Sequence, residues 1–165
     1  MIFITVGTTP LPFRRMADLV DRLALVRKHN ETIIFQRGDT PSLISGKNIF
    51  LYRYLPFMLM QRYIKNARVV ICHGGPATIY QVTATGKNPF VLPRQKRFGE
   101  HVNDHQVFYC DMLKKRGIIS SVIDCAAMLR VRQRRKYSPI NREPSPRLIA
   151  YLHDLTRPSF SKGNW

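Results

Sequence analysis

The chain has 165 residues, 44% of them hydrophobic, which is enough for one domain with a buried core. It contains no apolar run near the ~20 residues of a membrane-spanning helix, and its three cysteines lack the CxxC spacing of a zinc knuckle or a disulfide framework. The formal net charge of +17 favours a polyanionic ligand, such as nucleic acid, an anionic membrane surface or a phosphorylated small molecule.

The first third of the chain alternates apolar strands with helices. A short apolar run up to Gly7 predicts a buried strand, and apolar residues then recur at helical spacing. Pro56 suits the first turn of a second helix because its φ angle is fixed. The predicted elements are a strand at 2–6, a helix at 13–24, strands at 32–36 and 48–52, and a helix from 56 to about 66.

The rest of the chain continues this alternation, with Gly86 and Gly117 as helix stops. Strands are predicted at 69–72, 88–92 and 118–122, and helices at 76–85, 101–116 and 125–135. The pattern predicts an α/β fold, a Rossmann-like parallel sheet with helices on both faces. We expect residues 1–136 to form this domain and 137–165 to form a basic linker, a short helix and a tail.

A glycine turn, His73-Gly74-Gly75, stands between the fourth predicted strand and the helix after it. The N-terminus of a helix binds phosphate through its unpaired N–H groups and partial positive charge, and glycine lets the anion come close. His73 at the strand end is a candidate contact of the diphosphate. A plain tight turn between strand and helix is the alternative interpretation.

The helix after this turn supplies further candidates. The amides of Ala77 and Thr78, with the Thr78 hydroxyl, are predicted to face a diphosphate, and Gln81 lies on the same helix face, within reach of a ribose hydroxyl. Gly7 and Thr8, after the first strand, form a second candidate cradle. This turn does not continue as GxGxxG and is not a P-loop, so a dinucleotide fingerprint is absent.

A polar cluster follows the fifth predicted strand. Glu100 is predicted to accept a hydrogen bond from a sugar, and Asn103, His105 and Gln106 are further candidate contacts. His101 and His105 have the i, i+4 spacing that can bind zinc on a helix, but position 102 is not the Glu of HExxH and no third ligand is evident. We therefore favour sugar contacts over a metal, with an exposed helix start as the alternative.

The catalytic residues are not identified by these motifs. His73 and Glu100 are weak candidates for a general base. The chain has no Asp-x-Asp, so we predict neither a metal nor another cofactor. Charge on a leaving diphosphate would then be met by the helix dipole, by amides and by basic side chains such as Arg94, Lys96 and Arg97.

At these motifs the chain resembles glycosyltransferase family 28, specifically its C-terminal, donor-binding domain as found alone in split enzymes. The resemblance covers about residues 1–122. It rests on the opening Met1-Ile2-Phe3-Ile4-Thr5-Val6-Gly7-Thr8, on His73 to Thr78, on Val91-Leu92-Pro93-Arg94-Gln95 and on Phe98 to Gln106. The chain is most similar to the PssE-like half of two-chain transferases of capsule and exopolysaccharide synthesis.

This resemblance implies half of a GT-B fold and a donor site for a UDP-sugar. By motif position, Gly74, Gly75 and Thr78 would lie near the diphosphate, and His105 and Gln106 near the donor sugar or its phosphates. Gln81 stands where family relatives have a Glu that contacts ribose. The family reaction is inverting and metal-independent, and for this chain we expect transfer of a hexose from the UDP-sugar to a polyprenyl-diphosphate-linked acceptor.

The resemblance also implies a membrane-anchored partner subunit that binds the lipid-linked acceptor and carries the missing base, so the single chain is expected to have little activity. Nine basic and two acidic residues lie from 130 to 165, and this tail is a candidate contact with an anionic membrane surface. The chain opens without the basic flank of a signal peptide. We therefore expect a cytoplasmic location, peripheral at the membrane through the partner.

Two other functions remain open. A nucleic-acid-binding module is suggested by charge alone, but the aromatic residues do not interleave with the basic ones, so we expect no nucleic-acid partner. A non-catalytic regulatory subunit that keeps the fold without donor binding is suggested by Gln81. Binding of UDP separates both from the transferase subunit.

Overall fold

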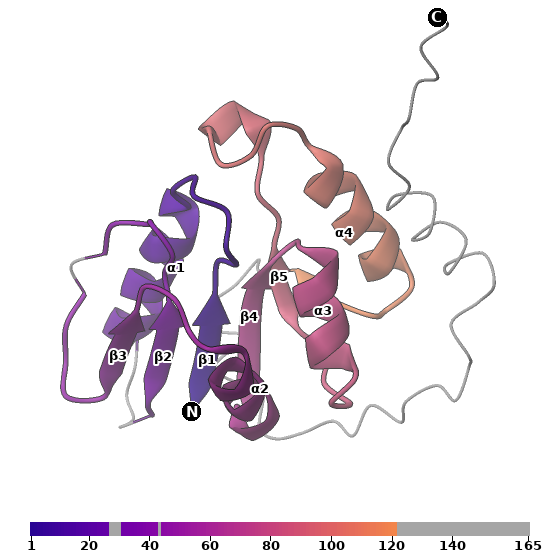
Figure 1. Cartoon of the computed structure of the whole chain (residues 1–165). Helices are drawn as coiled ribbons and strands as arrows, with labels where there is room; N and C mark the ends of the chain where they lie inside the picture. Colours follow the sequence, from indigo (N-terminus) through magenta and orange to yellow (C-terminus); the bar gives the residue numbers. More distant parts are fainter. Residues whose placement is uncertain (27–30, 43, 122–165) are drawn as a thin grey trace, which may run out of the picture.

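The computed structural model describes residues 1–26, 31–42 and 44–121 (Figure 1). Within these ranges six parallel strands form one sheet in the order β3-β2-β1-β4-β5-β6. The strands are β1 (Ile2–Thr5), β2 (Ile33–Gln36), β3 (Ile49–Tyr52), β4 (Val69–His73), β5 (Phe90–Leu92) and β6 (Ser120–Ser121). The helices are α1 (Arg14–Val26), α2 (Phe57–Asn66), α3 (Pro76–Thr83) and α4 (His105–Lys115), with a short 3₁₀ turn at Lys96–Phe98.

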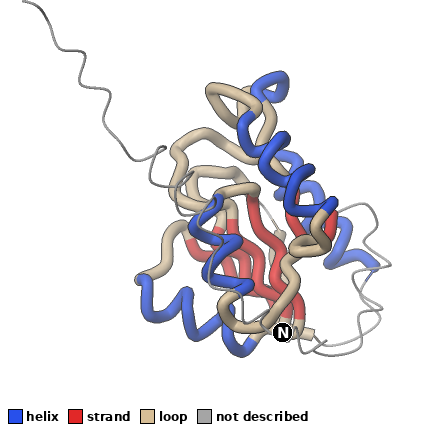
Figure 2. Tube along the Cα trace, turned by 90° about the vertical axis from the view of Figure 1, so that its right-hand side faces the viewer, coloured by secondary structure: helices blue, strands red, loops and turns tan. Residues whose placement is uncertain are grey.

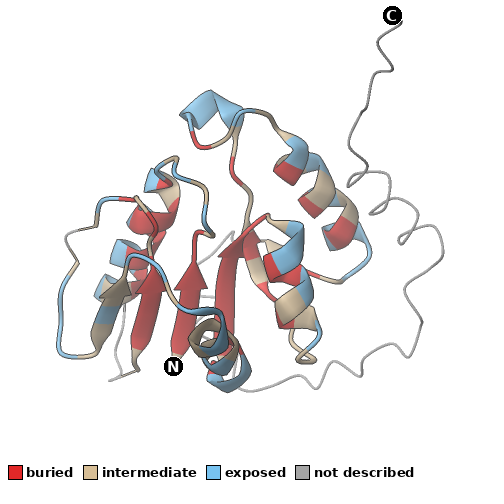
Figure 3. Cartoon of the chain, in the orientation of Figure 1, coloured by how far each residue is buried: buried red, intermediate tan, exposed pale blue. Residues whose placement is uncertain are grey.

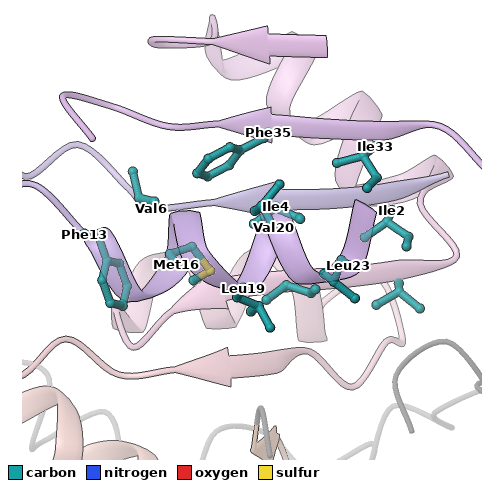
Figure 4. Packing of buried hydrophobic residues seen from close by; sticks show 12 residues of the cluster. Ile2, Ile4, Val6, Phe13, Met16, Leu19, Val20, Leu23, Ile33 and Phe35 are labelled. Carbon is teal, nitrogen blue, oxygen red and sulfur yellow. The ribbon is translucent and has the colours of Figure 1, made fainter. Parts of the chain in front are cut away.

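Helices cover both faces of this sheet, as Figure 2 shows from the side. The central strands β1, β2 and β4 are buried along their whole length, which explains their nearly continuous apolar sequence (Figure 3). On one face, α1 packs Met16, Val20 and Leu23 against alternate residues of these strands (Figure 4). On the other face, α2 and α3 close two further apolar clusters, and α4 packs beside α3.

The predicted α/β fold with a parallel sheet is confirmed, and the described strands and helices lie within a few residues of their predicted positions. The predicted helix at 125–135 and the boundary at 136 lie outside the described residues. No helix in the described ranges has the length and apolar character to cross a membrane.

The predicted start of the helix at 101 is wrong, because α4 begins at His105. Side chains compete for the backbone just before it: Asn103 Oδ1 accepts the amide of His105 at 3.2 Å, and Asp104 Oδ1 accepts the amide of Lys96 at 2.8 Å. His101 and His105 therefore do not share a helix face, which removes the basis of the zinc alternative. Among the described residues no three His, Cys, Asp or Glu side chains group as a metal site.

Lys87 closes the C-terminus of α2 from outside the helix. Its Nζ donates to the carbonyl oxygens of Lys65 at 2.6 Å and Ala67 at 2.7 Å, and also to that of Ile64. The last carbonyls of a helix lack partners within it and carry partial negative charge, so a lysine stabilises them.

Replacing Lys87 by methionine is expected to lower the free energy of unfolding by about 1–3 kcal/mol, because charge-assisted hydrogen bonds to the last carbonyls of α2 are lost. Urea unfolding measures this. The control is Lys47→Met at an exposed lysine, for which we expect a change within about 0.5 kcal/mol. Equal effects of the two substitutions would show that the cap is unimportant.

Candidate functional site

The carboxyl ends of the parallel strands bring the predicted site residues to one edge of the sheet (Figure 1). Gly7 and Thr8 follow β1, the turn at 73–76 joins β4 to α3, and the segment 93–104 joins β5 to α4. Open parallel sheets bind ligands at this edge. The structure therefore gathers residues that are far apart in sequence into one candidate site.

The imidazole of His73 lies between two glycine turns. A Cβ atom on Gly7 would stand 2.5 Å from His73 Cε1, and a Cβ on Gly75 would stand 2.2 Å from His73 Nε2. Both distances are far below van der Waals contact, so neither turn accepts a side chain while the ring is in place. The ring sets the spacing between the two predicted phosphate cradles.

Burial also decides the charge of His73. The side chain is 8% exposed, and desolvation, with Arg94 nearby, lowers the pKa of His73 to about 4. The imidazole is therefore neutral near pH 7, and it is a poor general base, since an efficient base has a pKa near the working pH. Its Nδ1 is buried without a hydrogen-bond partner in the described structure.

The N-terminus of α3 is open. Gly75 occupies the N-cap position without a side-chain cap, and Pro76 at the first helical position has no N–H. In any α-helix the amides of the first turn have no intrahelical acceptor, which here leaves those of Ala77 and Thr78. Ala77 is exposed, whereas Thr78 is 8% exposed. These two amides are therefore available to an anion, which is what the predicted phosphate cradle requires.

Gln106 holds this turn against the segment after β5. Its Oε1 accepts the amides of Gly74 at 3.0 Å and Arg94 at 3.1 Å, and the side chain is buried. A Cβ on Gly74 would stand 2.8 Å from Cys110 Sγ, so the turn is tightly packed against α4. The amide carbonyl of Gln106 is thus used within the protein, which favours a positioning role for that oxygen.

Arg94 is the largest fully buried side chain among the described residues. Its guanidinium donates to the carbonyl oxygens of Val6 at 2.9 Å, Leu11 at 2.8 Å and Glu100 at 3.0 Å, and it lies 4.6 Å from the ring centroid of Phe13. Desolvation lowers the pKa of Arg94 to about 10, so it stays protonated near pH 7. The expectation that Arg94 meets leaving-group charge is not supported, because its terminal nitrogens hold backbone carbonyls.

Glu100 is 2% exposed and belongs to an ion pair. Its Oε1 accepts from Arg15 Nε at 2.9 Å, and its Oε2 accepts from Arg15 Nη2 and from the amide of Gln95. Both oxygens are occupied, so the geometry favours a structural role over the predicted contact with a sugar or a role as base. Lys96 and Arg97, also predicted to meet leaving-group charge, are exposed nearby.

Three of the remaining candidates, Thr8, Asn103 and His105, lie at the same edge, and Gln81 lies further along α3. Gln81 on α3 has a buried Oε1 without a hydrogen-bond partner in the described structure. His105 is exposed at the first turn of α4, Asn103 is partly buried beside it, and Thr8 is exposed after β1.

Sequence reasoning missed Arg15 and Gln36. Gln36 at the end of β2 accepts the hydroxyl of Thr5 and donates from Nε2 to the carbonyls of Gly7 at 2.9 Å and Arg53 at 3.0 Å. It fixes the β1 turn from a neighbouring strand. The sequence signal for this role is the glutamine at the end of an otherwise apolar strand.

Comparisons with known proteins identify the family and the fold. The glycosyltransferase family 28 C-terminal domain matches residues 1–127. A UDP-N-acetylglucosamine--N-acetylmuramyl-(pentapeptide) pyrophosphoryl-undecaprenol N-acetylglucosamine transferase from Alkaliphilus metalliredigens (strain QYMF) is 29% identical over 92 residues, which is 55% of this chain and 23% of that protein.

The crystal structure of the glycotransferase of kitacinnamycin superposes with a TM-score of 0.54 at 17% identity, over 93% of this chain and 37% of that one. That likeness concerns the fold. The chain thus spans well under half the length of either relative. Since the family match covers most of the chain, the chain belongs to glycosyltransferase family 28, whose C-terminal domain it matches.

Proposed function

We propose that this chain binds the UDP-sugar donor of an inverting, metal-independent hexosyltransferase and acts as its donor-binding subunit. The acceptor is a polyprenyl-diphosphate-linked sugar of exopolysaccharide or capsule synthesis. The observation that carries the proposal is the open N-terminus of α3 at the carboxyl edge of a family 28 domain. The transferase from Alkaliphilus metalliredigens, whose name includes a UDP-sugar and a pyrophosphoryl-undecaprenol acceptor, supports the choice of substrates.

Two buried polar atoms without partners support a ligand at this place. His73 Nδ1 lies in the turn before α3, and Gln81 Oε1 lies one helical turn beyond Thr78. An unpaired buried acceptor costs about 1–3 kcal/mol, so such atoms are uncommon unless a ligand or water pairs with them. A ribose hydroxyl is a donor of the required kind for Gln81.

The proposed chemistry separates the two halves of the reaction. The acceptor hydroxyl attacks the anomeric carbon in line as the bond to UDP breaks, and a base takes the hydroxyl proton. In this chain, the amides and dipole of α3 stabilise the negative charge that develops on UDP. Neither His73 nor Glu100 is suited to be the base, so we assign that role to a separate acceptor-binding chain.

This partner is proposed to be membrane-anchored, so that the chain works peripherally at the cytoplasmic face. The basic segment from 130 to 165, outside the described residues, is proposed to contact the anionic lipid surface. Transfer by the single purified chain at the rate of the pair would contradict the need for a partner.

Calorimetric titration with UDP tests the donor site. We expect micromolar binding, about −8 kcal/mol, for the single chain. Absence of UDP binding would leave a fold without a donor site and favour the regulatory subunit, and steeply salt-dependent binding to nucleic acid would favour the third function.

Replacing Gln81 by leucine is expected to have opposite effects on binding and stability. UDP affinity should fall about tenfold with the loss of one hydrogen bond, while the free energy of unfolding should stay level or rise, because an unpaired buried acceptor is removed. Calorimetry and urea unfolding of the same preparations measure both. A large loss of stability, or unchanged UDP affinity, would contradict the ribose contact.

A further inference from the structure

We propose that Arg15 of α1 is a positioning residue for the donor sugar: its ion pair with Glu100 sets the place of the segment 95–104, and thereby of Asn103 and His105. The inference rests on the proposed function for its ligand. Under this proposal the ion pair determines the affinity for the sugar, whereas α3 determines the affinity for UDP. Arg15 need not touch the donor for this role.

The guanidinium of Arg15 contacts the chain around the 3₁₀ turn at several points. Nε and Nη2 meet the two oxygens of Glu100, and Nη2 also donates to the carbonyl of Pro93 at 2.8 Å. The guanidinium stacks 4.5 Å from the ring centroid of Phe98 and 5.5 Å from that of Phe13. One side chain thus contacts residues before and after the 3₁₀ turn at Lys96–Phe98, and the planar fork of arginine suits these contacts.

The segment has few other anchors on its outer side. Asp104 holds the amide of Lys96, Glu100 holds the amide of Gln95, and Arg94 holds the carbonyl of Glu100 from the interior. Phe98 and Val102, at 50% and 72% exposure, lie largely in solvent. Without Arg15, Glu100 loses its ion-pair partner and keeps the charge of Arg94 near it, and the unpaired oxygens of this buried carboxylate favour its movement to water together with the backbone on either side.

The structure supplies a matched control at the opposite edge of the sheet. Arg68 and Glu31 also form a two-point ion pair, with side-chain exposures of 24% and 20%, close to the 25% of Arg15. They precede β4 and β2, at the amino ends of the strands. Breaking this pair removes an ion pair of the same type from the same fold, away from the site, and Glu31 keeps its second partner, the N-terminal ammonium at 3.0 Å.

The first measurement is calorimetric binding of UDP, UDP-glucose, UDP-galactose, UDP-N-acetylglucosamine and UDP-glucuronate to wild type, Arg15→Met, Arg15→Lys and Arg68→Met. We expect wild type to bind one UDP-hexose more tightly than UDP. In Arg15→Met that advantage should fall by about tenfold to a hundredfold, as displaced positioning groups typically cause, with UDP affinity within about threefold of wild type. Arg68→Met should keep the advantage, and Arg15→Lys should recover part of it.

The second measurement is hydrogen exchange of the amides from 95 to 104, which needs no ligand. Protection there should fall in Arg15→Met and remain in Arg68→Met. Unchanged protection in a folded Arg15→Met chain, an unchanged hexose advantage, or a wild type that binds UDP but prefers no hexose would overturn the inference. If wild type fails to bind UDP, the proposed function is contradicted instead. Hydrogen exchange would still decide whether Arg15 holds the segment 95–104 in place.

Discussion

Arg94→Met is expected to lower the free energy of unfolding by about 3–5 kcal/mol, the largest effect of any single substitution considered for this chain. The guanidinium is fully buried and satisfies the carbonyls of Val6, Leu11 and Glu100. Methionine fills much of the volume but donates no hydrogen bond, and each buried carbonyl left unpaired costs about 1–3 kcal/mol. Part of this loss is offset because the buried charge is also removed.

A typical domain has a free energy of unfolding of about 5–15 kcal/mol, and a loss of this size is a large share of it. Cooperative urea unfolding should therefore report the loss directly. The control is Arg97→Met three positions along, where the guanidinium is exposed and donates to the side chain of Gln95. We expect a change within about 0.5 kcal/mol there. Arg94→Lys should lie between the two, since an ammonium lacks the planar fork. An Arg94→Met chain within 1 kcal/mol of wild type would contradict the argument.

The sequence was sufficient where the physical cause is local. Apolar runs marked the strands, because parallel strands covered on both faces bury every side chain, as in β1, β2 and β4. Gly86 and Gly117, with φ angles of 75° and 69°, ended their helices as predicted. A parallel sheet then places the residues after each strand at one edge, so the location of the candidate site followed from the element order.

Sequence reasoning failed where partners are distant along the chain. The sequence predicts that Glu100 accepts a hydrogen bond from a sugar, but in the structure its oxygens accept from Arg15, which stands 85 positions earlier. The sequence also predicts that Arg94 meets charge on a leaving diphosphate, whereas the structure buries it against carbonyls from the segment after β1. No local pattern distinguishes a charged residue that will be paired inside the protein from one that will remain in water. The start of α4 was missed because side chains bonded the backbone locally.

Gly75→Ala is expected to destabilise the chain by about 1–3 kcal/mol, and His73→Ala is expected to relieve that effect. The backbone of Gly75 has φ −74° and ψ 125°, which alanine adopts without strain. The obstacle is the ring of His73, 2.2 Å from the added Cβ, and Gly7 is also close to this ring, which restricts its movement. Removing the ring therefore removes the clash.

The relief appears as a coupling of about 0.5–3 kcal/mol between the two substitutions, measured from urea unfolding of the single and double variants. Gly7→Ala is the matched comparison, since its Cβ would also meet the ring, at 2.5 Å, but its φ of 78° strains any residue with a Cβ. In the His73→Ala background, Gly7→Ala should therefore still destabilise the chain by about 1–2 kcal/mol through backbone strain. Gly75→Ala should destabilise it little in the same background. Additive effects at Gly75, or equal rescue at both glycines, would show that the ring does not separate the two turns.

Because the same turns form the proposed phosphate cradle, UDP affinity should fall in Gly75→Ala. It should not return fully in the double variant, since the spacing that the ring sets is then lost.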